Sequence, residues 1–262
     1  MRRRRGVALV LVLWIVVILG AIAATVAGQT RAATAIATNA RARLVARYTA
    51  ESSIEATIAT IEDSLEVEPD SAARAQFLNS LESTPAADTV TIDRGRALVA
   101  VSDASARLDV NTATEEQLAR FFSQFTDLAQ AARAARDIRA WIERRAGAEA
   151  DVRIQLDAGG QTRTVRPLTS LDELAALHVV DQRTLAQAAA YLTVDGDGAI
   201  NMAAAAPAVR AVAAGEVREE PSRLVVIARG WEAGHSYTHE IQAVYAITAN
   251  RLVLVHWRER PL

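Results

Sequence analysis

The chain has 262 residues, with 29 basic residues against 31 acidic ones and a formal net charge of −2. This length leaves room for one large domain or two modest ones, and the mildly acidic balance argues against broad nucleic-acid binding, which needs a basic surface. The chain contains no cysteine, which excludes disulfides, thiol nucleophiles and cysteine-ligated zinc sites.

The N-terminus combines a basic flank with an apolar stretch. Arg2 to Arg5 and Gly6 lead directly into uncharged residues from Val7 to Ala27. About 20 residues of helix cross a bilayer core, so this stretch predicts a membrane-spanning helix. Because arginine clusters resist translocation, we expect the N-terminus in the cytoplasm and the bulk of the chain across the membrane.

An ordinary secretory signal peptide, cut near Ala24 or Ala27, is the simplest alternative. Its apolar core normally spans ~7–15 residues, which is shorter than the stretch found here. Helical periodicity also continues beyond the apolar stretch, at steps of three and four residues. The residues that carry this periodicity are Leu44, Tyr48, Glu51, Ile54, Ile58, Ile61 and Leu65. We therefore predict one helix from Val7 to about Leu65, while a removed signal peptide and a plain anchor of another protein remain open.

The start of the chain resembles a type IV prepilin leader. In that family a short basic leader ends in glycine and a prepilin peptidase cuts before the apolar helix; the matching residues are Gly6 and Val7. The resemblance implies a mature, N-methylated chain that begins at Val7. Most members carry a glutamate at the fifth mature position, where it neutralises the N-terminal ammonium of a neighbouring subunit. Leu11 stands there instead, a departure that is typical of minor pseudopilin K (GspK) of type II secretion systems.

Strand-like segments flank a helical region in the remainder of the chain. A short helix around Ala72 to Leu81 precedes a predicted hairpin of Thr89–Asp93 and Ala97–Val101, with a turn at Arg94 to Arg96. Residues 105–215 are alanine-rich and are predicted to be helical. Three closing strands follow, at Arg223–Trp231, Tyr237–Ile247 and Arg251–Trp257, joined by turns at Ala233-Gly234 and Ala249-Asn250.

The helical region carries a second resemblance. Its opening, LDVNTATEEQL from Leu108 to Leu118, resembles the start of a helix-hairpin-helix or SAM-like unit. Thr114 and Gln117 can form a capping box there, because each side chain can accept a hydrogen bond from the backbone amide of the other. The stretch INMAAA, from Ile200 to Ala205, repeats this opening with Ala203 in place of an asparagine.

A second capping box is predicted at Ser170 and Glu173, before two short helices joined near Val179 to Asp181. Units of this type often bind DNA, through glycine-bearing hairpins that hold a phosphate on backbone amides. The hairpins here contain no glycine, and Asp127 and Asp181 would repel phosphate. We therefore expect no nucleic-acid binding, with a membrane-anchored DNA receptor of the competence type as the main alternative from another class.

No catalytic constellation is evident, and we expect a protein that is not an enzyme. His235 and His239 lie in a predicted strand, where ~13 Å would separate their side chains, too far to share one zinc ion. Asp195-Gly196-Asp197-Gly198 resembles the start of a calcium loop. Ala205 stands where an EF-hand needs glutamate, which favours a tight turn.

Some pseudopilin K proteins hold calcium through an acidic loop of the inserted domain. The residues that match this loop are Glu143, Glu149 and Asp151, with two arginines among them. Together with Asp195 and Asp197 they are weak calcium candidates, and we expect no cofactor, with calcium as an open alternative.

These features predict an α+β protein with a long N-terminal transmembrane helix, a pilin-like antiparallel sheet and an inserted all-helical domain. The expected divisions are a leader at 1–6, the membrane part of the helix at 7–27, its soluble part at 28–65, the first part of the pilin-like domain at 66–104, the inserted domain at 105–215 and the second part at 216–262.

The resemblance implies a single-pass protein of the inner membrane, with its bulk in the periplasm, that stands at the tip of the pseudopilus. There it would start assembly and help to export folded proteins across the outer membrane. The implied partners are minor pseudopilins I and J and the prepilin peptidase, with no small-molecule substrate. The helix residues expected to pack on partner helices are Ala21, Ala23, Ala24, Val26 and Ala27. A generic anchored periplasmic domain is the structural alternative.

Overall fold

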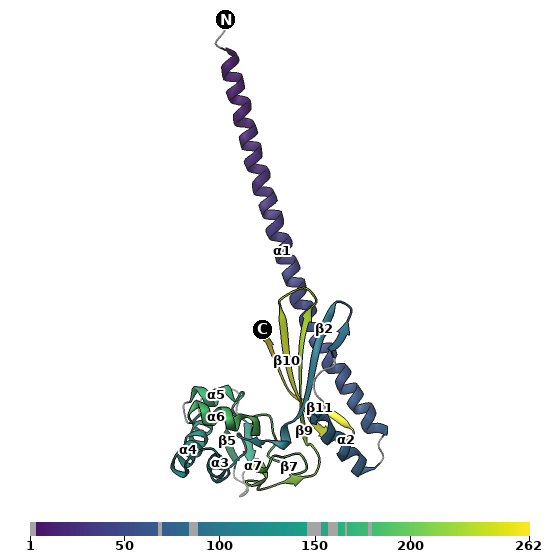
Figure 1. Ribbon diagram of the computed structural model, residues 1–262, viewed down its shortest axis with the longest axis vertical. Coiled ribbons are helices and arrows are strands. Elements are labelled where there is room, and N and C mark those ends of the chain that lie inside the picture. Colours follow the sequence, from purple (N-terminus) through teal and green to yellow (C-terminus); the bar gives the residue numbers. More distant parts are fainter. Residues whose placement is uncertain are drawn as a thin grey trace.

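The computed structural model describes residues 4–67, 70–83, 89–145, 153–156, 162–165, 167–177 and 180–262. A long helix runs out of a head in which an antiparallel sheet packs against the C-terminal half of the helix (Figure 1). A group of short helices lies beside the end of the sheet that is farther from the N-terminus (Figure 1). The arrangement confirms the expected α+β class with a long N-terminal apolar helix, and it is consistent with a pilin-like fold.

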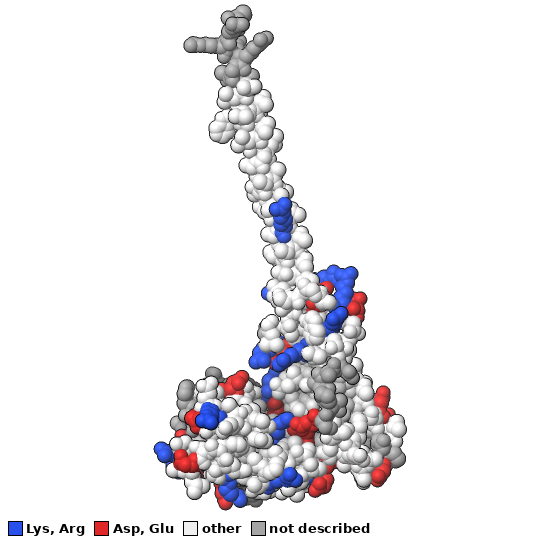
Figure 2. Space-filling model, viewed as in Figure 1, with Lys and Arg blue, Asp and Glu red and all other residues white. Residues whose placement is uncertain are grey.

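Helix α1 (Arg4–Val67) has 64 residues, which correspond to about 95 Å at 1.5 Å per residue. Among the described residues it is the one helix that is long and apolar enough to cross a membrane. Its N-terminal half stands clear of the head as a nearly uncharged rod (Figure 2). The helix is therefore consistent with a single-pass membrane anchor.

The sheet has five antiparallel strands in the order β1-β2-β9-β10-β11. The strands are β1 (Thr89–Ile92), β2 (Gly95–Asp103), β9 (Arg223–Glu232), β10 (Thr238–Thr248) and β11 (Arg251–Pro261). Strands β2 and β9 are direct neighbours although more than a hundred residues separate them, so the helical region enters and leaves the head between two paired strands. The predicted hairpin and all three closing strands are present, and β11 continues to Pro261, beyond Trp257 where the last strand was predicted to end.

One face of the sheet packs on α1 and forms the core of the head. Helix α2 (Ser71–Ser83), predicted around Ala72 to Leu81, closes this core with Leu78. The buried residues that form it, besides Leu78, are Ala50, Ile54, Ile58, Ile61, Leu65, Leu224, Val226, Ala228, Ile241, Ala243, Tyr245 and Leu252.

Leu44 and Tyr48, the first residues of the predicted helical stripe, lie in α1 but not on its buried face. Leu44 and Tyr48 are 54% and 57% exposed, whereas Ala42, Ala46 and Ala50 are buried. Four-residue steps back from Ile54 lead to these alanines, so the contacting face carries the smallest side chains. Large apolar residues indicate a buried face only where the neighbouring backbone leaves room for them, and the strands here lie too close to α1.

The predicted turn at Arg94 to Arg96 is also displaced. Ile92 pairs directly with Gly95, so the turn residues are Asp93 and Arg94, with Asp93 at a φ of 51°. Gly95 lies in β2 against α1, where an added Cβ would overlap the side chain of Thr49. The glycine is thus needed for close approach to the helix rather than for chain reversal.

The helical region has its own core, separate from that of the head. Its helices are α3 (Glu115–Phe122), α4 (Leu128–Arg145), α5 (Asp172–Ala176), α6 (Gln182–Ala188) and α7 (Pro207–Arg210), with short 3-10 turns at Ala104–Ala106 and Ala189–Tyr191. The largest side chains of this core belong to Phe121, Phe122, Leu118, Ile138 and Ile142.

The prediction that residues 105–215 are all helical is wrong. The helices alternate with short strands: β3 (Leu108–Asp109) pairs with β6 (Leu192–Thr193), β4 (Arg153–Leu156) with β5 (Thr162–Val165), and β7 (Ile200–Asn201) with β8 (Val217–Arg218). Most of these strands have only two residues, which is too short for a period-two pattern to be detected. The high alanine content of residues 105–215 therefore led to the prediction of more helix than the structure contains.

Replacing Gly230 by alanine should destabilise the head. An added Cβ would lie 2.8 Å from the backbone nitrogen of Ala50 and closer still to the carbonyl oxygen of Ala46. Backbone atoms cannot rotate away, so we expect Gly230→Ala to lower the free energy of unfolding by about 2 kcal/mol or more, as overpacked cores do. Urea unfolding followed by tryptophan fluorescence would measure this.

Gly28→Ala is the matched control for this substitution. No atom lies within 4 Å of its added Cβ on the exposed helix. Equal stability of Gly230→Ala and Gly28→Ala would contradict the close packing of α1 on β9.

Candidate functional site

The exposed half of α1 is the first candidate site. Every described side chain from Leu9 to Arg41 is exposed, and Arg31 is the one charged residue between Leu9 and Ala40. Such a length of apolar surface is not stable in water and requires lipid or another protein surface. This half of α1 is therefore a surface for a membrane, for partner helices, or for both in turn.

The structure places the predicted site residues of the anchor on this one helix. Leu11 is 59% exposed, and the predicted assembly residues are exposed as well: Ala21, Ala23, Ala24, Val26 and Ala27. Gly6 and Val7 lie within the helical backbone of α1, and the first three residues of the expected leader lie outside the described residues. The expected roles of these residues in leader cleavage and assembly stay predictions.

The hydroxyl groups on the anchor are bonded within the helix. The hydroxyls of Thr25, Thr30 and Thr34 each donate to the carbonyl oxygen four residues earlier, at 2.8 to 2.9 Å. A hydroxyl that is bonded in this way costs little in an apolar environment. These three hydroxyls are thus compatible with an apolar environment.

An ion pair fixes α1 to the edge strand where the helix enters the head. The guanidinium of Arg47 donates two hydrogen bonds to the carboxylate of Glu259 on β11, each at 2.8 Å. Trp257 and His239 also contact this carboxylate, at 2.9 and 3.1 Å. These contacts, with Arg47 first among them, lower the pKa of Glu259 to about 2.

The opening motif of the helical region forms the predicted capping box. The hydroxyl of Thr114 accepts from the amide of Gln117 at 3.1 Å, and the Gln117 side chain accepts from the amide of Thr114 at 2.9 Å. Just before it, Asn111 makes three hydrogen bonds that join the opening to the backbone at Leu168 and Val194.

The second copy of the opening has the same backbone geometry. The carboxylate of Asp109 accepts from the amide of Asn111, two residues on, and Asn201 accepts in the same way from Ala203. In both copies the carbonyl oxygen of the first residue also accepts from the amide four residues later. The alanine at position 203 removes the side-chain bonds that Asn111 makes, but not the turn itself.

The second predicted capping box is wrong in its pairing. Helix α5 starts at Asp172, and the carboxylate of Glu173 accepts from the amide and hydroxyl of Thr169 rather than from Ser170. Ser170 accepts from the amide of Asp172. Asp181, at the end of the predicted joint, caps α6: its carboxylate accepts from the hydroxyl and the amide of Thr184 and from the amide of Arg183, and these bonds lower its pKa.

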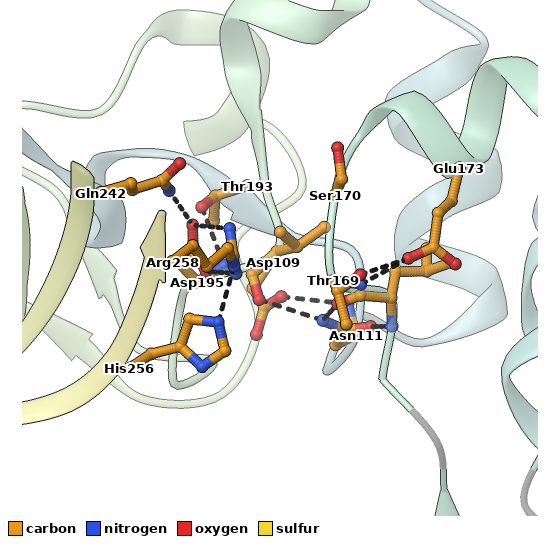
Figure 3. A network of polar contacts seen from close by, with 12 residues as sticks. Asp109, Asn111, Thr169, Ser170, Glu173, Thr193, Asp195, Gln242, His256 and Arg258 are labelled. Atoms are coloured by element: carbon orange, nitrogen blue, oxygen red, sulfur yellow. Dashed lines mark hydrogen bonds and ion pairs between the residues drawn. The ribbon is translucent and has the colours of Figure 1, made fainter. Parts of the chain in front are cut away.

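A buried polar layer joins the helical region to the sheet and is the second candidate site (Figure 3). Arg258 of β11 forms an ion pair with Asp195, whose carboxylate also accepts from the Gln242 amide at 2.8 Å. Nearby, the fully buried Asn201 donates to Asp103 and to Asn79, both at 2.7 Å. The sequence interpretation missed this layer, since it assigned no chemistry to the closing segment that carries Arg258.

The calcium candidates do not form one group. The carboxylate of Asp195 pairs with Arg258, and that of Asp197 accepts from Ser222 at 3.0 Å and from the amide of Ala199 at 3.1 Å. Glu143 lies 3.9 Å from Arg139 on α4. Glu149 and Asp151 lie outside the described residues. Within the described part of the chain, no cluster of three metal-binding side chains occurs.

The two histidines considered for zinc contact different carboxylates. His235 lies in the loop between β9 and β10 rather than in a strand, and its ring is 3.5 Å from Glu232. His239 lies on β10 and contacts Glu259 instead. The predicted strand for His239 is confirmed and that for His235 is wrong, because the loop that contains the turn at Gly234 continues to Tyr237 and β10 begins only at Thr238.

Asp109 should make stability depend on pH. Burial raises its pKa to about 6, so ionisation of this carboxylate above pH 6 costs folding free energy. In Asp109→Asn the amide oxygen can still accept from Asn111, as Asn201 does in the second copy. We expect this variant to be more stable than the wild type by about 2–3 kcal/mol at pH 8, with the gain fading toward pH 4.

Urea unfolding of both proteins at pH 4.5 and pH 8 would measure this difference. Asp181→Asn is the control, since the pKa of Asp181 is shifted in the opposite direction and its replacement gives no gain at pH 8. A gain for Asp109→Asn that is equal at both pH values would contradict the assignment.

Comparison with known proteins shows similarity to solved structures but not to known sequences. No protein-family model and no curated protein sequence matches the chain. Among solved structures, it is similar to a chain in the GspK-GspI-GspJ complex of the type 2 secretion system of enterotoxigenic Escherichia coli. The TM-score is 0.49 and the sequence identity 9%, over 72% of this chain and 94% of that chain.

Proposed function

We propose that this protein is a minor pseudopilin of a type II secretion system, in the position of component K at the tip of the pseudopilus. In this role it has no enzymatic activity. It is held in the inner membrane by α1 until its leader is removed, and it then starts the assembly that helps to export folded proteins. The head lies in the periplasm.

The continuity of α1 carries this proposal. One unbroken helix presents an exposed apolar half and then forms part of the core of the head. A removable signal peptide needs no rigid connection to the fold that follows it. A subunit that moves from the bilayer into a helical assembly does need a rigid connection, because its helix packs in the assembly and thereby determines where its head lies.

Two further features support the tip position. Leu11 provides no carboxylate for the N-terminus of a subunit above it, and an acidic residue in its place would cost ~2.5–3.5 kcal/mol in the membrane. The helical region lies to one side of the sheet and widens the head (Figure 1). Both features favour a terminal subunit over one within a repeating shaft.

The DNA-receptor alternative is disfavoured by the contacts at the predicted hairpins. The carboxylates of Asp127 and Asp181 accept hydrogen bonds from backbone amides at the starts of α4 and α6. A DNA phosphate would need these same amides. Each carboxylate therefore stands where the phosphate would bind.

The mature N-terminus is the first test. We expect cells that contain a prepilin peptidase to produce a chain starting at Val7, N-methylated, and cells without the peptidase to retain the leader. Mass spectrometry of the purified protein would measure this. Gly6→Leu should retain the leader in both strains, and Gly20→Leu, further along the helix, serves as its control.

A mature chain that starts near Gly28 would identify an ordinary secreted protein and exclude the pseudopilin proposal. An intact leader in the presence of the peptidase would instead favour the anchored receptor.

Assembly with partners is the second test. We expect the mature chain to copurify from membranes with minor pseudopilins I and J. Because small side chains permit close helix approach, the double variant Ala21→Leu/Ala24→Leu should reduce the recovered partners at least fivefold. Ile22→Leu, which keeps the size of an exposed neighbour, should not. Undiminished recovery with the double variant would show that this face is not used.

A further inference from the structure

Arg31 stands alone on the exposed half of α1. It is the one charged residue between Leu9 and Ala40, and the rod around it is uncharged (Figure 2). Its side chain is exposed, and within the described part of the chain no hydrogen bond or ion pair joins it to another residue. Its charge therefore has no partner among the described residues.

The next three arginines of α1 differ from Arg31 in this respect, because each of them contacts the head. Arg41 lies 3.9 Å from Glu232, Arg43 lies over the ring of Tyr237, and Arg47 pairs with Glu259. These contacts fix α1 to the head, whereas Arg31 takes no part in the attachment.

The place of Arg31 along α1 fits the width of a bilayer. Arg5, the last arginine of the basic flank, and Arg31 are about 39 Å apart along the helix at 1.5 Å per residue. A bilayer is ~40–45 Å wide with its headgroup layers, around a hydrocarbon core of ~30 Å. With the basic flank at one headgroup layer, Arg31 therefore reaches the other.

We propose that Arg31 binds lipid phosphate at the headgroup layer on the side of the head, and that this contact marks where α1 leaves the bilayer. A guanidinium is always charged and presents a planar fork of donors that matches a phosphate group. An arginine within the hydrocarbon core is costly, and its long side chain extends toward the headgroups instead. This inference rests on the anchor role of α1 in the proposed function.

The apolar character of α1 does not by itself mark this boundary. Uncharged residues continue beyond Arg31 from Ala32 to Ala40, a segment that we call the neck. From Val7 to Ala40 the helix is about 50 Å long at 1.5 Å per residue, well above the thickness of the hydrocarbon core. A helix with too long an uncharged stretch tilts in the bilayer. Tilting would draw the neck into the lipid, and the phosphate contact of Arg31 opposes this.

The contact thus keeps the neck in water. Ala42 is the first buried residue among those described on α1, and it lies about 16 Å beyond Arg31 at 1.5 Å per residue. The head therefore stands clear of the headgroup layer. All side chains of the neck are exposed, so a partner helix can reach them while the protein is still in the membrane.

Cysteine accessibility along α1 tests the proposal. The chain has no native cysteine, so single cysteines can be placed in the full chain, held in nanodiscs of phosphatidylethanolamine and phosphatidylglycerol. The exposed positions are Ala24→Cys, Gln29→Cys and Ala33→Cys. The last two point away from Arg31 on the helix, so the guanidinium does not act directly on their thiols. We expect a membrane-impermeant maleimide to react with Ala33→Cys at least tenfold faster than with Ala24→Cys.

Substitutions of Arg31 should move this boundary in opposite directions. Arg31→Leu allows the neck to enter the bilayer, so Ala33→Cys should react at least threefold more slowly. Arg31→Glu keeps a charge that phosphate repels, so Gln29→Cys should react at least threefold faster. Arg31→Lys retains the positive charge and should leave both rates within twofold of the wild type. Thr30→Leu is the matched control, because it adds an apolar side chain beside Arg31 and should change neither rate.

Unchanged rates in Arg31→Leu would overturn the proposal. Equal rates for Arg31→Glu and the wild type would show that any charge sets the boundary, and would overturn the contact with phosphate. If Ala24→Cys reacts as fast as Ala33→Cys in the wild type, α1 does not lie in the bilayer. That last result would exclude the anchor role itself, which separates a failure of the proposed function from a failure of this inference.

Discussion

Gly230 allows the backbone of β9 to lie directly against α1 at Ala46 and Ala50, and the other features of the head follow from this contact. A helix that approaches a sheet so closely must carry small side chains, and α1 carries alanine at positions 42, 46 and 50. Further along, isoleucine and leucine fill the space between helix and sheet. The direction of α1, and with it the position of the exposed anchor relative to the head, is fixed by this series of side chains.

The helical region is attached in a different way. It leaves β2 and returns to β9, two strands that pair along their whole length, so its ends are fixed by the sheet. Its remaining contact with the head contains buried carboxylates and amides and the arginines Arg107, Arg223 and Arg258. Apolar contacts are non-directional, whereas a layer of this kind depends on geometry and on protonation. The helical region is thus held to the sheet by paired strands at both of its ends and by a contact that includes directional polar bonds.

The sequence predicted those parts of the structure that follow from local patterns. The long helix, the hairpin, the closing strands and the capping box at Thr114 all arise from periodicity or from side chains a few residues apart. The errors occur where the local structure depends on contacts with residues that are distant in sequence. The periodicity that begins at Leu44 does not mark the buried face of α1 there, because the proximity of β9 cannot be inferred from α1 alone, and Gly95 was assigned to a turn because Thr49 lies far away in sequence. Arg258 and Asp195 are 63 residues apart, and no local pattern connects them.

The bonded hydroxyls of Thr25, Thr30 and Thr34 have a consequence for the energetics of transfer. Each hydroxyl carries its hydrogen bond within the helix, so this bond need not be exchanged when the surroundings change. A segment of this kind can leave lipid for a bundle of protein helices, or return, without breaking a polar contact on either side. For these three hydroxyls the free-energy difference between the two environments includes no broken hydrogen bond, so the cost of moving the helix is set by its other side chains.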